Sequence, residues 1–491
     1  MNVKVACTAS FLTLLLLFSF GCESSPSQSD LVAIGDSITM GIQDAGLIKD
    51  YQLHSYPYLI AHQMGVAESF EQPLVRSPGF GVPPYKVPLR LYEGRIIAEY
   101  FQGSIDGINR VILMLSYFPL FENWDLPRPY NNLGVGGARL QDVRSATSYV
   151  NSSLPYNFMF NIVLRNSEST EETILDQTVE LNPRILLLWI GNNDILGAVL
   201  AGGDETFITD RDYFRDELDL LVSELRNSTD ADIFMANIPG YLSFVYALDG
   251  ILQVVNRYIP NEEVPVLFDY QTYQPLSFGG GDYLPLITEE EDVEFVLIPG
   301  IILSMEDGTG LPYSQFLTEE LGYSPEEASG LLTDMSGAGL NTTGTGVGMP
   351  IPGNLTITES EMLVFINAVD EFNAVIDEIS NAHGVPLVDI HHLWDPDQPD
   401  AFDGYSGEFV FDDPVNTTFS LDGVHPNNLG HAIIANAFIA KINDTLGEGI
   451  PELDTEEYVG QYAQYAGLGS RTLSLKALQD VGIFFKSHPS K

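Results

Sequence analysis

Ser37 is the first residue of this chain whose type and setting could do chemistry. It lies in LVAIGDSITMG (31–41), where four apolar residues precede Gly-Asp-Ser and an amphipathic run. A serine at the turn between a strand and a helix can be presented as a nucleophile, but a serine in the same place can also cap the helix. The local pattern fits both interpretations, so the remainder of the chain has to distinguish them.

Two later segments carry hydrogen-bond donors that a serine nucleophile would need. NNLGVGGARL (131–140) is a glycine-rich loop whose backbone N–H groups can approach a ligand closely. It does not fit the dinucleotide fingerprint, because Arg139 stands where the last glycine should be. WIGNNDIL (189–196) follows an apolar run and offers the side-chain amide of Asn193, which alone could be only a helix cap.

An Asp–His pair lies near the carboxyl end of the chain, in SLDGVHPNN (420–428). Asp422 precedes His425 by three residues, with a glycine to make the turn and a proline to fix the exit. A carboxylate at this spacing can orient an imidazole, so the pair could act as the general base for a serine. The adjacent His391 and His392 in DIHHLW are interpreted as an ordinary pair at the end of a strand.

The elements that must position these groups alternate between strands and helices. Near-continuous apolar runs predict strands at 31–34, 184–190, 232–238 and 386–390. Amphipathic patterns predict helices at 38–48, at 213–228, from Thr358 to a C-cap at Gly384, and at about 429–442. Strands that are apolar throughout are buried on both faces, so the pattern predicts a parallel sheet covered by helices on both sides.

The four segments together resemble the GDSL, or SGNH, hydrolase family. Its blocks occur here in family order as GDSI, N-L-G-V-G-G, GNND and DGVHP, within a domain expected at 30–450. The resemblance implies a three-layer α/β/α sandwich with a flavodoxin-like parallel sheet. Its active site would lie at the carboxyl ends of the strands, where open parallel sheets bind their ligands. Large loop insertions are expected at the same edge, at about 42–130 and 240–357.

The resemblance also implies a role for each site residue. Ser37 would be the nucleophile, His425 its base and Asp422 the carboxylate that orients the imidazole. The oxyanion hole would consist of the N–H groups of Ser37 and Gly137 and the amide of Asn193. No metal and no cofactor is expected.

The match to the family has two departures and one assignment made by counting. Ile38 replaces the usual leucine after the nucleophile, and Ser37 and Gly137 are further apart than in compact members. The resemblance gives the oxyanion glycine five residues after Asn132, which selects Gly137 over Gly134.

The amino-terminal residues, MNVKVACTASFLTLLLLFSFGC, are typical of an export signal. One lysine precedes an apolar run that is short for a membrane span. Gly21-Cys22 resembles a lipoprotein cleavage site, although Ser19 stands where leucine is usual. We therefore expect a signal peptide at 1–21, a lipidated Cys22 and a polar tether at 22–29. The protein would be an exported, membrane-anchored lipoprotein of the outer membrane, facing the periplasm or the cell surface. Ordinary cleavage and an uncleaved anchor are the alternatives.

The composition limits the possible binding partners and the possible cysteine chemistry. The chain has 491 residues, with 21 Lys+Arg against 68 Asp+Glu and a formal net charge of −47. Such a surface repels phosphate backbones, which argues against nucleic-acid binding, and adaptation to high salt is a competing explanation of the charge. Cys7 lies inside the expected signal, so Cys22 alone remains, and the mature chain can form no internal disulfide. The acidic loop 395–404 could bind calcium but is interpreted as a solvated loop.

Three functions remain open at this point. The leading expectation is an exported hydrolase of carboxylic esters, of esterase or lipase type, acting on a small-molecule or lipid ester. An acetylesterase acting on decorated carbohydrate is the alternative, and a non-catalytic surface binding lipoprotein is the third. The sequence assigns no role to the tail at 451–491 and does not predict the oligomeric state.

Overall fold

The structure is a computed structural model. It describes residues 28–82, 88–92, 95–97, 118–154, 156–166, 170–200, 204–240, 293–296, 314, 318, 323–337, 356–394, 417–422 and 424–460. The expected signal peptide, Cys22 and the acidic loop 395–404 lie outside these ranges, as do most of 240–357 and the tail beyond 460.

The core is a five-stranded parallel sheet with the order β11-β8-β7-β1-β6. Its strands are β1 (Leu31–Gly35), β6 (Asn132–Gly134), β7 (Ile185–Trp189), β8 (Asp232–Ala236) and β11 (Leu387–Val388). The second core strand in the chain lies outside the first, and the third, fourth and fifth follow on the other side. This is the flavodoxin-like order, so the predicted fold class is confirmed.

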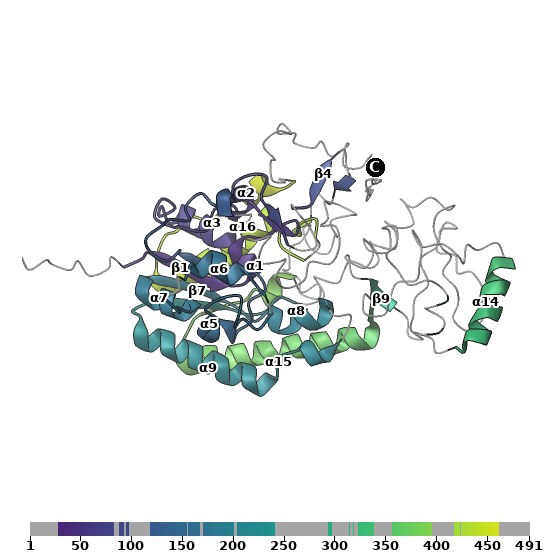
Figure 1. Ribbon diagram of the computed structural model, residues 1–491. Helices are drawn as coiled ribbons and strands as arrows, with labels where there is room; N and C mark the ends of the chain where they lie inside the picture. Colours follow the sequence, from purple (N-terminus) through teal and green to yellow (C-terminus); the bar gives the residue numbers. More distant parts are fainter. Residues whose placement is uncertain are drawn as a thin grey trace, which may run out of the picture.

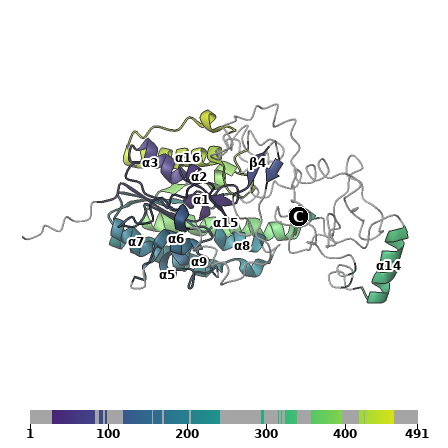
Figure 2. The same ribbon diagram turned by 45° about the horizontal axis from the view of Figure 1, so that its top comes forward.

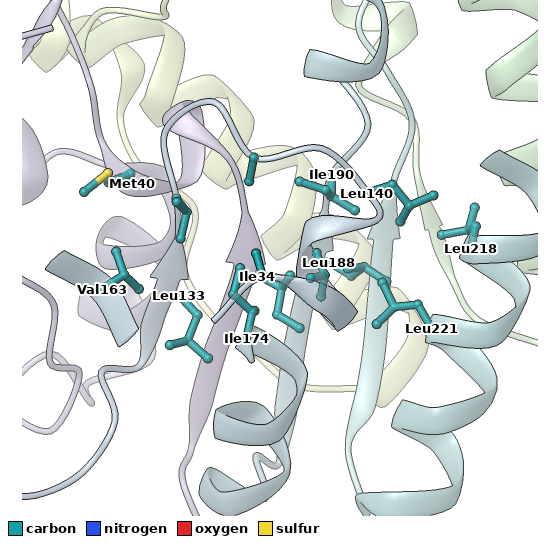
Figure 3. Packing of buried hydrophobic residues seen from close by; sticks show 14 of the residues in the cluster. Ile34, Met40, Leu133, Leu140, Val163, Ile174, Leu188, Ile190, Leu218 and Leu221 are labelled. Carbon is teal, nitrogen blue, oxygen red and sulfur yellow. The ribbon is translucent and has the colours of Figure 1, made fainter. Parts of the chain in front are cut away.

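Both faces of the sheet are buried, which explains the continuous apolar runs. Alternate residues of one strand point to opposite faces. Ile34 and Leu188 therefore join one hydrophobic cluster, while Ala33 and Leu187 join the other. Figure 3 shows the first cluster, in which side chains of β1, β6 and β7 meet those of the covering helices.

Helices cover the two faces unequally, as Figures 1 and 2 show. One face carries α3 (Tyr56–Gln63) and α16 (Asn428–Leu446). The other carries α5 (Asp142–Ser145), α6 (Met159–Leu164), α7 (Ile174–Leu181), α8 (Asn193–Leu200), α9 (Arg211–Ser228) and α15 (Glu359–His383). The apolar stripes of α9 and α15 meet each other, where Phe214 stacks on Phe372 with ring centroids 4.2 Å apart.

The long amphipathic helices lie where their patterns predict them, but the helix expected at 38–48 was wrong. α1 spans only Ser37–Met40. Gly41 ends it at φ +85°, where its N–H bonds to the carbonyls of Ser37 and Ile38. A left-handed residue cannot continue a right-handed helix, so the chain turns into β2 (Gly46–Leu47), which pairs with β3 (Phe80–Gly81).

The interval 42–130 is not purely an insertion. It contains α2 (Lys49–Gln52), β4 (Arg90–Tyr92), β5 (Arg95–Ile97), the 3-10 helix η1 (Phe118–Leu120) and the core helix α3. Tyr56 and Ile60 of α3 are fully buried against the sheet. Within 240–357 the described elements include α14 (Pro325–Gly337) and β9 (Val293–Val296), which pairs with β10 (Thr356–Thr358).

The remaining short elements are the 3-10 helices η2 (Glu205–Phe207), η5 (His391–Trp394) and η6 (Thr455–Tyr458). The start of the tail packs on α16, since Leu453 exchanges two hydrogen bonds with the Asn436 side chain. Across the described ranges, no helix combines the length and the apolarity needed to cross a membrane.

Candidate active site

Ser37 lies at the carboxyl end of β1, in the turn between the strand and α1. Asp36, not Ser37, caps the helix, because Asp36 Oδ1 accepts the N–H of Ile38 at 3.0 Å. Gly35 makes the turn possible, since a Cβ there would lie 1.9 Å from Thr39 Oγ1. The capping interpretation of Ser37 is therefore wrong, and its hydroxyl is not engaged by the helix end.

Asp422 and His425 form a hydrogen-bonded pair in the loop before α16. Asp422 Oδ2 lies 2.8 Å from His425 Nδ1. Asp422 Oδ1 accepts the backbone N–H groups of Val424 and His425, each at 2.9 Å. The carboxylate is therefore fixed by its own loop, and His425 Nε2 is the ring nitrogen left for other partners.

The two side chains hold each other in their charged forms. Burial alone would raise the pKa of Asp422, but the charge of His425 and the hydrogen bonds lower it to about 2. Burial acts to lower the pKa of His425, but the charge and hydrogen bond of Asp422 raise it above its ordinary value, with further contributions from Asp36 and Asp44. His425 therefore accepts a proton more readily than a free histidine.

The structure brings the segment that follows Ser37 and the loop of the Asp–His pair together from opposite ends of the chain. The N–H of Ala45, shortly after α1, donates to Asp422 Oδ2 at 2.5 Å. The charge of His425 also acts on Asp36, the residue before Ser37. Within the described residues, no hydrogen bond joins the Ser37 hydroxyl to His425. Catalytic contacts of this kind are often loose until substrate binds.

The two candidate oxyanion glycines have different surroundings. The N–H of Gly134 already bonds to Asn132 Oδ1 at 3.0 Å, and a Cβ on Gly134 would lie 2.5 Å from the backbone nitrogen of Met40. Gly134 therefore serves the close packing of β6 against α1. Gly137 lies beyond the strand at φ +77° and is partly exposed. In the part of the chain that the structure describes, the N–H groups of Gly137 and Ser37 have no acceptor.

Asn193 contacts the glycine-rich loop at Ala138, the residue after Gly137. It is the first residue of α8, and its Nδ2 donates to the carbonyl of Ala138 at 3.0 Å. This bond orients the amide and uses one of its two hydrogens, so a second donor remains. The oxyanion roles of Ser37, Gly137 and Asn193 stay predictions, but their surroundings fit those roles.

Three supporting residues received no role from the sequence. Asn192 Nδ2 donates to Asp36 Oδ2 at 2.9 Å, which joins the GNND block to the GDSI block. Asp194 accepts the N–H of Leu140 at 2.9 Å and the hydroxyl of Thr209 at 2.7 Å, which fixes α8 against the glycine loop. Burial raises the pKa of Asp36 and of Asp194 to about 6. Their places inside the motif blocks were the only sequence signal for them.

The other candidates are structural or lie outside the described ranges. His391 Nδ1 lies 3.2 Å from the carbonyl of Ile238, and His392 lies 3.4 Å from Asp389, so both histidines contact the strand ends. No cluster of histidine, cysteine and acidic side chains suited to a metal ion occurs among the described residues.

Comparison with known proteins gives one family-model match. Residues 31–252 match the model of the GDSL-like lipase/acylhydrolase family, and this range contains Ser37, Gly137 and Asn193. No curated protein matches the chain. Among solved structures, LAE5, an alpha/beta hydrolase enzyme from the metagenome of Lake Arreo, Spain, is similar with a TM-score of 0.31 and 14% identity. That match covers 84% of this chain and 94% of LAE5.

Proposed function

Because residues 31–252 match the GDSL-like lipase/acylhydrolase family model, we propose that this protein hydrolyses carboxylic esters with Ser37 as nucleophile, His425 as base and Asp422 as its orienting carboxylate. The observation that carries the proposal is the buried Asp422–His425 hydrogen bond, 2.8 Å long, in a loop bonded to the segment that follows Ser37. Both residues lie beyond the matched range, so their pairing supports the assignment independently of the family match.

The proposed reaction passes through an acyl-enzyme on Ser37. Ser37 Oγ attacks the ester carbonyl while His425 Nε2 takes its proton, because Nδ1 is bonded to Asp422. The N–H groups of Ser37 and Gly137 and the Asn193 amide would stabilise the oxyanion. His425 then gives its proton to the leaving alcohol. A water molecule, deprotonated by His425, releases the acid from Ser37 and restores the hydroxyl.

An apolar group beside the oxyanion loop favours an esterase or lipase over an acetylesterase. Leu154 is 51% exposed, and its Cδ2 lies 3.2 Å from where a Cβ on Gly137 would stand. Tyr156, which is 49% exposed, follows in the same loop. An exposed apolar surface next to the reacting carbonyl would bind the hydrocarbon part of an acyl group.

The test uses a soluble form beginning near Ser24 and p-nitrophenyl esters of increasing acyl length, compared with acetylated sugars. We expect hydrolysis of the nitrophenyl esters, abolished by Ser37→Ala, with kcat/KM rising from acetate to longer acyl chains. Activity that survives in the folded Ser37→Ala protein would contradict the nucleophile assignment. A preference for acetylated sugars would identify the acetylesterase, and a folded protein that turns over neither class would favour a binding role.

We also propose that Cys22 carries a lipid anchor at the outer membrane after export. The sequence Gly21-Cys22 at the end of an apolar run supports this proposal. The wild-type protein should partition with the membrane fraction and Cys22→Ala should not. Membrane retention of Cys22→Ala would contradict lipidation.

A further inference from the structure

Asp44 is a buried carboxyl next to the Asp–His pair that the proposed mechanism does not use. It is 4% exposed and lies between α1 and β2. Asp44 and Ala45 have φ values of 52° and 53°, so both adopt the left-handed conformation without being glycine. Such residues cost free energy and persist where the surrounding structure holds them. The contacts of Asp44 and Ala45 show what holds these two residues in that conformation.

The left-handed pair presents two successive backbone donors to the loop that carries Asp422. The N–H of Asp44 donates to Ser420 Oγ at 2.9 Å, and the N–H of Ala45 donates to Asp422 Oδ2 at 2.5 Å. Asp422 Oδ2 is therefore also held by a backbone N–H from outside its own loop.

The side chain of Asp44 holds the same loop from a third point. Its Oδ1 accepts the N–H of Leu421 at 2.7 Å, and its Oδ2 accepts the hydroxyl of Tyr51. Three hydrogen bonds from two adjacent residues therefore fix the loop at Ser420, Leu421 and Asp422. Tyr51 lies in α2 and is itself buried, so the carboxyl is fixed on both sides.

The charge of Asp44 also acts on the Asp422–His425 pair. Burial raises the pKa of Asp44 to about 7, while the bonds from Tyr51 and Leu421 and the charge of His425 oppose that rise and the charge of Asp422 adds to it. In return, Asp44 is one of the carboxyls that raise the pKa of His425, together with Asp422 and Asp36. Asp44 therefore changes its charge in the pH range where a histidine base works.

We propose that Asp44 is a positioning residue for the Asp422–His425 pair, and that its negative charge stabilises the protonated imidazole that forms when Ser37 attacks. The proposal rests on the proposed function, since it assigns His425 as the base. Asp44 does not touch the reacting atoms and acts through the loop and through His425.

The first test is Asp44→Asn, which keeps an oxygen for the Leu421 N–H and removes the charge. We expect kcat to fall by about tenfold with KM changed less than about twofold, because the lost charge stabilises only the transition state. The acid limb of the kcat/KM profile should move to lower pH by about one unit, because His425 loses a neighbouring negative charge. Asp50→Asn on α2 removes the same charge at a less buried position and should change neither quantity.

A second measurement separates this proposal from the proposed function. The imidazole of His425 can be titrated by NMR with labelled histidine, its signal assigned by its loss in His425→Gln. The titration should move to lower pH in Asp44→Asn, whether or not the protein cleaves an ester. If Asp44→Asn does not fold, Tyr51→Phe can replace it, because it removes a hydrogen bond that stabilises the charged form of Asp44. It should move the His425 titration in the same direction. An unchanged His425 titration in a folded variant would overturn the proposal, whereas a wild type that hydrolyses no ester would overturn only the proposed function.

Discussion

Asp422→Asn should keep the shape of the Asp422 side chain while it removes the negative charge. In the native protein, Asp422 Oδ1 accepts the N–H groups of Val424 and His425, while Oδ2 accepts the N–H of Ala45 and faces His425 Nδ1. Asparagine has one acceptor oxygen and one donor amide group. If the oxygen keeps the two loop N–H groups, the amide donates to Nδ1 and places the ring proton on Nε2. His425 Nε2 could then no longer take a proton from Ser37.

These contacts set the expected losses of kcat and of unfolding free energy. The wrong histidine tautomer costs a serine triad about 10⁴-fold in kcat, or about 5 kcal/mol of barrier. The pKa of Asp422 falls from 3.8 to about 2 on folding, which stabilises the native state by about 2 kcal/mol at neutral pH. Because the pKa is lowered on folding, this contribution is complete above pH 3.8 and is lost as the pH falls through 2.

The assay measures kcat on a saturating p-nitrophenyl ester and the free energy of unfolding in urea at pH 7 and near pH 3. The kcat of Asp422→Asn should be about 10⁴-fold below that of wild type. Its deficit in unfolding free energy relative to wild type should be larger at pH 7 than near pH 3. Asp389→Asn is a matched control, because Asp389 and His392 have the same spacing but are about half exposed. It should keep kcat within about twofold. A folded Asp422→Asn protein within tenfold of the wild-type kcat would refute the orienting role.

Three further predictions concern Asn193, Gly137 and Asp194. Asn193→Ala should lower kcat by ~10²- to 10³-fold with little change in KM, and a change confined to KM would contradict its oxyanion role. Gly137→Ala should lower the free energy of unfolding in urea by about 1 to 3 kcal/mol, because φ is +77° and the new Cβ would lie 3.2 Å from Asn157 and Leu154. An unchanged value would show that this turn is not fixed. Burial raises the pKa of Asp194 from 3.8 to about 6, so its contribution is present below pH 3.8 and about 3 kcal/mol is lost as pH rises through 6. Asp194→Asn should flatten the urea stability profile between those pH values, and an unaltered slope would contradict this.

The fold could be predicted from sequence wherever burial imposes a regular pattern of apolar residues. The run 185–190 is apolar throughout because β7 is buried on both faces in the middle of the sheet. The stripe of α9 repeats every three to four residues because one side faces the sheet and α15. Thr358 and Gly384 likewise bracket α15, which spans Glu359–His383.

The local course of the chain around Ser37 could not be predicted in the same way. The run after Ser37 has a helical pattern, but Gly41 ends α1 because its left-handed backbone turns the chain away. The contact of Ala45 with Asp422 joins positions far apart in sequence, and a backbone N–H has no residue type to mark it. Gly134 and Gly137 are distinguished in the sequence only by the count from Asn132 that the family resemblance supplies. Their different surroundings, the close approach of Gly134 to Met40 and the positive φ of Gly137, come from the structure.

The central claim is that Ser37 is the nucleophile, and covalent labelling tests it most directly. A fluorophosphonate should add one phosphonyl group to the protein, and mass spectrometry of the peptides should locate it on Ser37. Ser37→Ala should not be labelled, and His425→Ala should be labelled far more slowly, because the base is missing. An adduct on another serine, or undiminished labelling of folded Ser37→Ala, would contradict the account.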